Sequence, residues 1–170
     1  MTTAYLLCGP SLSGKSTLAD RIARHLGAIV CSADAINARR GLAFGGEGLD
    51  ESVWAETLRL ELEAVREAGA GGTSIVVDDT LCYRWLRDRL RAAALAGGLQ
   101  TRLLLLRPPE AELLARRAEI ARTGVRPLLS LPRLREHLAS FEWPGADESP
   151  VDLTTPAQQD GWLRGEHAGG

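Results

Sequence analysis

A glycine-rich segment near the start of the chain constrains the fold more than any other feature. Residues 9–16 read GPSLSGKS, with an apolar run at 4–8 before them and an amphipathic pattern at 15–26 after them. A strand, a loop of the form G-x-x-x-x-G-K-[S/T] and a helix, in this order, are typical of a site that binds phosphate. Gly9 and Gly14 allow backbone angles that other residues resist, and let main-chain N–H groups approach an anion. The segment therefore predicts a phosphate-binding loop between a strand and a helix.

The one lysine of the chain lies inside this loop. Of the 20 basic residues, all but Lys15 are arginines. A compact ammonium on a flexible stem can reach the β- and γ-phosphates of a nucleotide, and the Ser16 hydroxyl is a suitable ligand for Mg²⁺. We therefore expect ATP and Mg²⁺ as cofactors. The residues expected to bind the nucleotide are Gly9, Pro10, Ser11, Ser13, Gly14, Lys15, Ser16 and Thr17.

The rest of the chain alternates apolar runs with helical patterns. The runs lack polar alternation, which indicates parallel strands buried on both faces of a sheet. We therefore expect an α/β fold, a three-layer parallel sheet in a single domain. Strands are expected at 4–8, 28–32, 73–79, 101–106 and 150–155. Helices are expected at 15–26, 33–40, 50–70, 84–96, 110–122 and 132–141, with one further turn at 162–163. We expect the domain to occupy residues 1–158 and a C-terminal tail to occupy 159–170, with a mobile loop at 41–50.

Composition and charge exclude several classes of protein. A net charge of −2 over 170 residues gives no general attraction to nucleic acid or to an anionic membrane. The apolar runs are too short to span a bilayer, and the N-terminus lacks the pattern of a secretory signal. Cys8, Cys31 and Cys82 are widely spaced and predict neither a disulfide framework nor a zinc site. We therefore expect a cytoplasmic protein without a membrane partner.

Carboxylates follow two further apolar runs. Asp34 comes after the second run, and Asp78 and Asp79 come after the third. The carboxyl ends of parallel strands meet at one edge of a sheet, so these side chains are expected near the phosphate loop. Adjacent residues of an extended chain point opposite ways, so one of Asp78 and Asp79 is expected to face Mg²⁺, and the sequence does not decide which. Asp34 is expected to be the general base that accepts a proton from an acceptor hydroxyl. The alternative for each carboxylate is a helix N-cap or a solvated strand end.

Two groups of arginines are candidates for binding anions. The first lies at the end of the helix predicted at 110–122 and beyond it, and comprises Arg116, Arg117, Arg122 and Arg126. Arginine suits the negative charge of a phosphoryl group in transfer, and Arg116 and Arg122 are the expected catalytic arginines. Arg39 and Arg40 follow Asp34 and are candidates for binding an anionic acceptor. A solvated helix face is the alternative for both groups.

Four segments together resemble a known family. They are CGPSLSGKST, CSADAINARR, SIVVDDTLCYRWLRDRL and LLLLRPPEAELLARRAEIARTG, and the similarity runs from about residue 4 to 155. They resemble the small P-loop kinases, which include polynucleotide 5′-hydroxyl kinase, chloramphenicol phosphotransferase, zeta-type toxins and the kinase domain of phosphoseryl-tRNA kinase. The resemblance implies a P-loop NTPase or kinase fold. It also implies that Asp34 is the base and that Lys15 and Ser16 contact the nucleotide. Acceptor-binding residues of the family lie in the segments corresponding to 41–50 and 83–85, which adds Tyr83 to the expected acceptor site of Asp34, Arg39 and Arg40.

These observations predict an ATP-dependent phosphotransferase that moves the γ-phosphate to a hydroxyl of a small molecule, such as an antibiotic or another metabolite. The expected partners are ATP and this acceptor, and the sequence does not decide whether the chain forms a homo-oligomer. One alternative is a kinase that acts on an RNA end, a tRNA-linked group or a nucleotide sugar. Another is an ATPase that serves as a switch or assembly factor. A basic groove formed by Arg39, Arg40, Arg84 and Arg87 would favour the RNA alternative.

Overall fold

The computed structural model describes residues 1–42, 48–125 and 127–167. The strands and helices follow one another along the chain as the alternating apolar and amphipathic patterns predict. In chain order they are β1 (Thr3–Cys8), α1 (Lys15–Leu26), β2 (Ile29–Ser32), α2 (Ala33–Arg39), α3 (Glu51–Ala70), β3 (Ile75–Asp78), α4 (Arg84–Ala96), β4 (Gln100–Leu105), α5 (Glu110–Thr123), α6 (Leu131–Ala139), the 3-10 turn η2 (Ala146–Glu148), β5 (Val151–Asp152) and α7 (Pro156–His167).

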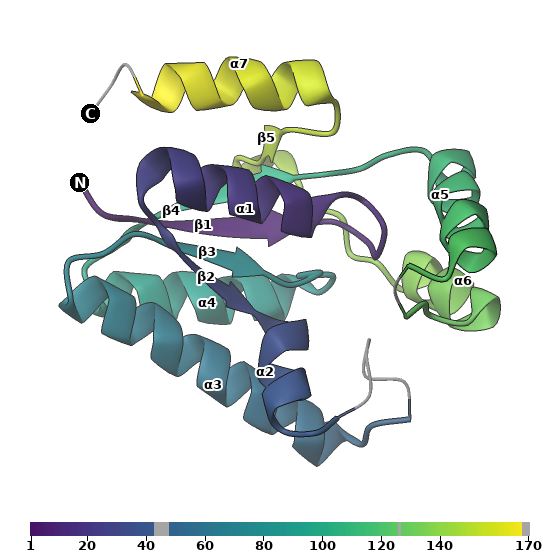
Figure 1. Cartoon of the computed structure of the whole chain (residues 1–170). Coiled ribbons are helices and arrows are strands. Elements are labelled where there is room, and N and C mark those ends of the chain that lie inside the picture. The colour runs from purple at the N-terminus through teal and green to yellow at the C-terminus, as the bar shows by residue number, and fades with distance from the viewer. Residues whose placement is uncertain (43–47, 126, 168–170) are drawn as a thin grey trace.

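The strands form one parallel sheet with the order β2-β3-β1-β4-β5. Strand β1 lies at its centre, where Leu6 is paired with Val77 of β3 and with Leu103 of β4. Helices α1 and α7 cover one face, α3 and α4 cover the other, and α5 and α6 lie beyond the carboxyl end of β1 (Figure 1). The predicted three-layer parallel fold is confirmed, although β5 is shorter than the strand expected at 150–155. Strand order reverses beside β1, which is where sheets of this kind bind ligands.

Strand β1 is apolar throughout because both of its faces are buried. Ala4, Leu6 and Cys8 pack into the core under α3 and α4. Tyr5 and Leu7 pack into the core under α1 and α7. Burying one leucine side chain contributes roughly 1.5–3 kcal/mol. The central strand therefore anchors both cores and holds the loop that follows it in a fixed place.

The C-terminal segment differs from the expectation of a tail at 159–170. Helix α7 continues to residue 167, so the expected boundary falls inside the helix. Leu163 is buried, and the Trp162 ring meets the Tyr5 ring edge-on, with 5.7 Å between the centroids. Helix α7 also contacts α1. Because these apolar side chains complete the second core, α7 is part of the domain.

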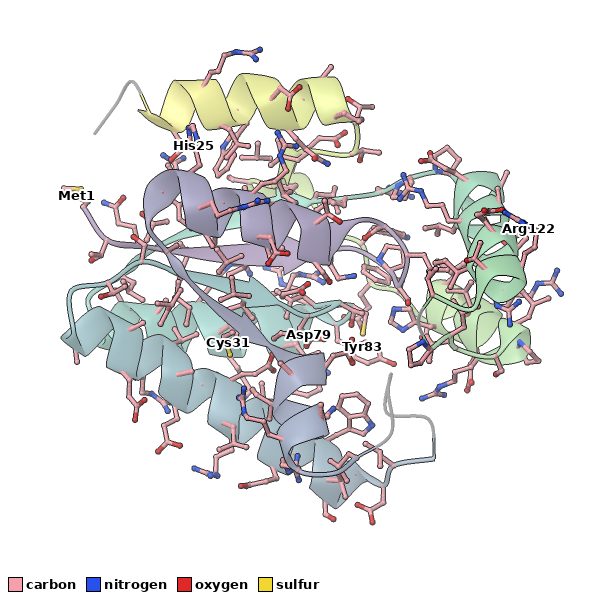
Figure 2. All side chains as sticks on the ribbon, viewed as in Figure 1. Met1, His25, Cys31, Asp79, Tyr83 and Arg122 are labelled. Atoms are coloured by element: carbon pink, nitrogen blue, oxygen red, sulfur yellow. The ribbon has the colours of Figure 1, made fainter. Side chains whose placement is uncertain are left out.

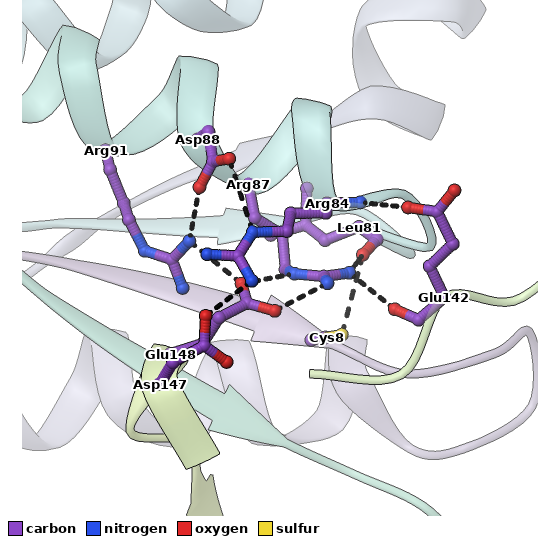
Figure 3. A network of polar contacts seen from close by, with 9 residues as sticks. All are labelled: Cys8, Leu81, Arg84, Arg87, Asp88, Arg91, Glu142, Asp147 and Glu148. Carbon is purple, nitrogen blue, oxygen red and sulfur yellow. Dashed lines mark hydrogen bonds and ion pairs between the residues drawn. The ribbon is translucent and has the colours of Figure 1, made fainter. Parts of the chain in front are cut away.

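A buried ion pair fastens the segment before β5 to helix α4 (Figure 3). The Arg87 guanidinium donates hydrogen bonds to both carboxylate oxygens of Glu148, at 2.8 and 2.7 Å. It also donates to the carbonyl oxygens of Leu81 and Glu142, at 2.8 and 2.9 Å. Arg91 forms a second ion pair with Glu148 at 2.9 Å. Both oxygens of the Glu148 carboxylate and all three nitrogens of the Arg87 guanidinium are paired, so the network is a structural clamp.

The arginines proposed for an RNA-binding groove do not line one surface. Arg87 is buried in the network, and Arg84 forms an ion pair with Asp147 at 2.5 Å (Figure 3). Arg40 donates hydrogen bonds to Val53 and Thr57 of α3. No helix among the described residues has both the length and the apolar character needed to cross a membrane.

Candidate active site

The loop after β1 presents unpaired N–H groups at the start of helix α1. Gly14, at the N-cap position, has a φ of 100°, a left-handed conformation that favours glycine. No side chain caps α1, and its first turn contains no acidic residue. The first N–H groups of a helix lack partners within the helix and carry partial positive charge. The start of α1 is therefore built to receive an anion, as the sequence predicts.

Lys15 lies at this helix start with its side chain folded back over the loop. Its Nζ donates a hydrogen bond to the Pro10 carbonyl at 2.8 Å, and the residue is buried. Burial lowers the pKa of Lys15, and the carboxylates of Asp78 and Asp79 oppose this by raising it. The ammonium is thus held where the loop, the helix start and two carboxylates meet.

Gly9 is required for a reason that differs from the expected one. Its φ is not in the left-handed region. A Cβ atom at this position would lie 2.5 Å from the Leu106 carbonyl oxygen and 2.9 Å from Ser13 Oγ. Glycine therefore allows the loop to pass close to the end of β4. In the same loop Leu12 has a φ of 72°, an uncommon conformation for a residue with a branched side chain.

Asp78 and Asp79 have different surroundings. Asp78 ends β3, and the nearby Ser16 hydroxyl lowers its pKa. The Asp79 carboxylate accepts a hydrogen bond from the backbone N–H of Thr80 at 2.6 Å. Asp78 and Ser16 therefore lie close together near Lys15, whereas the Asp79 carboxylate is bonded to the turn after β3.

Opposing effects act on the pKa values of Asp78 and Asp79. Burial raises the pKa of Asp78, while the Ser16 hydroxyl and Lys15 lower it. Burial also raises the pKa of Asp79, while the Thr80 N–H and Lys15 lower it. A cation bound beside Asp78 would favour its ionised form.

Asp34 occupies the first turn of α2 and is exposed. It is not the N-cap of this helix, because Ser32 has that role and its hydroxyl accepts the Ala35 N–H at 3.3 Å. The negative charge of Asp34 raises the pKa of Lys15 and of Asp78, so its carboxylate lies near both groups. The structure thus brings the expected base to the same edge of the sheet as the phosphate loop.

The arginines of α5 separate into residues near the loop and residues away from it. Arg116 donates a hydrogen bond to the Leu12 carbonyl at 2.8 Å and forms an ion pair with Glu112. Arg117 donates to the Leu129 carbonyl at 3.2 Å, which joins α5 to the segment before α6. Arg122 is 72% exposed and paired with Glu119. Figure 2 shows Arg122 on the outer side of α5, away from Asp79. Arg126 lies outside the described residues.

The other residues expected at the acceptor site are also divided. Arg39 is exposed on α2, whereas Arg40 donates hydrogen bonds to Thr57 Oγ1 at 2.6 Å and to the Val53 carbonyl at 3.2 Å. Tyr83 precedes α4, and its ring stacks on the ring of Trp85 with 6.3 Å between the ring centroids. Figure 2 shows Tyr83 and Asp79 at the same end of the sheet. Residues 43–47 of the expected loop 41–50 lie outside the described residues.

A family model accounts for this arrangement of loop, helix and strand ends. The AAA_33 family, an AAA domain, matches residues 5–144. The chain belongs to this family. Matched residues include the phosphate loop, the carboxylates and the start of α5, so the AAA_33 domain contains every group of the site described so far.

Similar structures and sequences add information on the fold of this AAA_33 domain. A sugar kinase from Janibacter sp. HTCC2649 is 23% identical, with 99% of this chain and 94% of that chain covered and a TM-score of 0.68. A gluconokinase from Sinorhizobium meliloti 1021 is 22% identical, with 98% and 94% covered and a TM-score of 0.67. A tRNA dimethylallyltransferase from Chlorobium luteolum is 32% identical over 122 residues, which are 71% of this chain and 40% of that protein. The AAA_33 domain spans a third to two-fifths of the length of the curated relatives it matches. The resemblance to the small P-loop kinases is confirmed at the level of family and fold.

Three residues of the AAA_33 domain that sequence reasoning missed lie between α2 and α3. Asn37, Thr57 and Glu61 are buried polar residues. Burial raises the pKa of Glu61 well above its usual value, and the charges of Asp79 and Asp78 raise it further. One signal was available in the sequence, because Glu61 lies three residues after the apolar Leu58 and four before Val65. This spacing places a carboxyl on the buried face of an amphipathic helix.

Proposed function

We propose that the chain is an ATP-dependent phosphotransferase that moves the γ-phosphate of ATP to a hydroxyl of a small-molecule acceptor, with Asp34 as the general base. The observation that carries this proposal is the uncapped start of α1, where Lys15 and the Ser16–Asp78 pair lie near Asp34. The similarity in fold to a sugar kinase and a gluconokinase supports a small hydroxylated acceptor.

The donor side consists of the loop and the first turn of α1. Backbone N–H groups between Gly9 and Thr17 would bind the phosphates, and Lys15 would leave the Pro10 carbonyl to contact the β- and γ-phosphates. Ser16 and Asp78 are suited to hold Mg²⁺, because a hydroxyl and a carboxylate oxygen lie next to each other there. When bound, Mg²⁺ neutralises charge on the β- and γ-phosphates.

The acceptor side supplies the proton transfer. Asp34 accepts the proton of the acceptor hydroxyl while the oxygen of that hydroxyl forms a bond to the γ-phosphorus. The bond from this phosphorus to the oxygen of the β-phosphate breaks, and ADP leaves with the electron pair. Arg116, whose guanidinium donates a hydrogen bond to the Leu12 carbonyl of the loop, would balance the charge that develops on the phosphoryl group. Arg122, on the outer side of α5, has no such placement.

An ADP-release assay against a panel of hydroxylated metabolites and antibiotics tests this proposal. Lys15→Ala is expected to abolish acceptor-dependent ADP release, and Asp34→Asn to reduce kcat by roughly 100-fold or more. Asp160→Asn, an exposed aspartate on α7, is the control and should keep full turnover. Full turnover by Asp34→Asn would contradict the role of base. Equal ADP release with and without any acceptor would instead favour the switch or assembly ATPase.

The salt dependence of acceptor binding distinguishes an RNA acceptor from a small-molecule acceptor. Binding of RNA through several phosphate contacts weakens steeply with salt, because bound counterions are released. The pairing of Arg84 with Asp147 and of Arg87 with Glu148 removes two cations from such a surface. We therefore expect RNA ends to give no acceptor-dependent ADP release at physiological salt.

A further inference from the structure

Strand β2 forms one edge of the sheet, and its outer side is open. Among the described strands it pairs with β3 alone. The Ile29 N–H donates a hydrogen bond to the Ser74 carbonyl at 3.0 Å, beside the parallel pairing of Ile29 with Ile75. Alternate residues of a parallel strand bond to the same neighbour, so the N–H and C=O groups of Val30 face away from β3. The open edge therefore presents a backbone donor and a backbone acceptor at Val30.

Strand β2 lacks the features that protect exposed edges in natural sheets. Such edges are blocked by charged side chains, proline, bulges or very short strands. Strand β2 reads Ile-Val-Cys-Ser, with neither a charge nor a proline, and is four residues long. The opposite edge strand, β5, has two residues, one of which is Asp152. The chain therefore protects one edge of its sheet and leaves the other able to pair.

Apolar side chains are exposed on both faces of β2. Ile29 is 48% exposed and Val30 is 42% exposed. Adjacent residues of a strand point to opposite faces of the sheet. Neither the layer of α3 and α4 nor the layer of α1 and α7 therefore covers this edge completely. A partner that covers both side chains has to continue the sheet and its two helix layers, which a second copy of this chain does.

A groove beside β2 is lined by residues of α2 and α3. Its volume is about 340 Å³, and its apolar lining includes Ile36, Leu60 and Ala64. Charged residues of both signs also line it, among them Arg39 and Glu67, which are exposed. A groove of one sign would favour a partner of the opposite charge. A groove with both signs is able to complement a copy of itself.

Arg39 and Glu67 lie toward opposite ends of β2. Arg39 is the last residue of α2, which follows the carboxyl end of β2. Helix α3 ends at Ala70, shortly before β3 begins at Ile75 beside Ile29, so Glu67 lies toward the amino end of β2. When two copies of β2 pair antiparallel, the carboxyl end of each lies beside the amino end of the other. Arg39 of each copy then lies on the side of Glu67 of the other, so opposite charges meet twice across the two-fold axis.

We propose that β2 pairs antiparallel with β2 of a second copy of this chain, about a two-fold axis beside Val30. The two Val30 residues exchange both backbone hydrogen bonds, and Ile29 of each copy lies opposite Cys31 of the other. The two sheets become one continuous sheet, and Arg39 of each copy faces Glu67 of the other. This inference concerns assembly and does not depend on the proposed phosphotransferase activity.

Sedimentation velocity of the full chain across a concentration series tests the proposal. Wild type is expected to approach twice the 18.3 kDa mass of the chain as its concentration rises. Val30→Lys places two like charges opposite each other at the axis and should raise the Kd of the dimer at least about 30-fold. Leu95→Lys is the matched control, because Leu95 is an exposed apolar residue of α4, and it should leave the Kd unchanged. A wild-type monomer at every concentration, or an unchanged Kd in Val30→Lys, would overturn the proposal.

Reversing the charges tests the antiparallel arrangement. Glu67→Arg should raise the Kd about tenfold, because arginines of the two copies then face each other. Combining it with Arg39→Glu should restore the Kd to within about threefold of wild type. A double variant as weak as Glu67→Arg alone would overturn the arrangement.

Hydrogen–deuterium exchange identifies the surface that pairs. Exchange in the peptide 28–32 should slow as the wild-type concentration rises, because the Val30 N–H gains a partner. The melting temperatures of Val30→Lys and Leu95→Lys, measured on dilute protein, should agree, since both side chains are exposed. A dimer that forms without slower exchange in this peptide uses another surface and would refute the proposal.

Discussion

Replacing Glu148 by glutamine tests the clamp that joins the segment before β5 to α4 (Figure 3). The side chains of Arg87 and Glu148 are 1% and 2% exposed. Hydrogen bonds from Arg87, helped by Arg91, lower the pKa of Glu148 from 4.5 to about 2. At about 1.4 kcal/mol per pKa unit, this difference corresponds to about 3.5 kcal/mol of stability at neutral pH. Removing one partner of a buried ion pair costs a similar amount, roughly 3–5 kcal/mol.

Urea unfolding followed by far-ultraviolet circular dichroism measures this cost. We expect Glu148→Gln to reduce the free energy of unfolding by about 3 kcal/mol. The control is Glu136→Gln, because Glu136 is 67% exposed in its ion pair with Arg133. The control should change the free energy by less than about 0.5 kcal/mol. If the two variants lose the same free energy, the reasoning from burial is wrong.

The pH dependence of stability gives an independent check. The folded-state pKa of Glu148 lies below its unfolded value of 4.5, so its contribution is fully present above that pH. The contribution is lost as the pH falls from 4.5 toward about 2. Glu148→Gln should therefore lose less stability than wild type over this window. Parallel curves for the two proteins would contradict the assignment.

Three further predictions concern the site. Gly9→Ala places a Cβ 2.5 Å from a main-chain oxygen and should destabilise the fold by about 1–3 kcal/mol; an unchanged melting temperature would show that the loop adapts. Arg40→Ala removes hydrogen bonds that hold α2 on α3 and should lower the free energy of unfolding in urea by about 1–3 kcal/mol. Arg39 is exposed, so Arg39→Ala should change this free energy by less than about 0.5 kcal/mol. Equal losses in the two variants would contradict the structural role given to Arg40 alone. Arg116→Ala should lower kcat about tenfold and Arg122→Ala should leave it unchanged; the reverse order would assign the phosphate contact to the outer residue.

Local patterns predict much of the fold. Helix Lys15–Leu26 and helix Arg84–Ala96 have the bounds expected from apolar spacing and the glycines that follow them. Of helix α7 only one turn at 162–163 was expected, because few apolar residues mark its buried side and its stability comes from Trp162 and Leu163 packing on distant residues. Such contacts leave no periodic signal in a short segment.

The candidate site is predictable to a similar extent. The loop and the approach of Asp34 follow from strand ends meeting at one edge of the sheet. Which of Asp78 and Asp79 faces Ser16 depends on the turn after β3, and the separation of Arg116 from Arg122 depends on how α5 packs beside the loop. Neither is encoded by the spacing of residues alone.

The sequence by itself determined that this chain has a phosphate loop on a parallel sheet, because glycine, lysine and serine at fixed spacing act through local backbone geometry. The tertiary structure decided why Gly9 must be glycine, since the steric limit is set by the end of β4, about a hundred residues away. It also decided that Arg87 is a clamp, and that Asn37 and Glu61 each keep a buried polar atom without a hydrogen-bond partner among the described residues. Burial and pairing are properties of residues brought together by the fold, so the donor side can be inferred from local sequence and the acceptor side cannot.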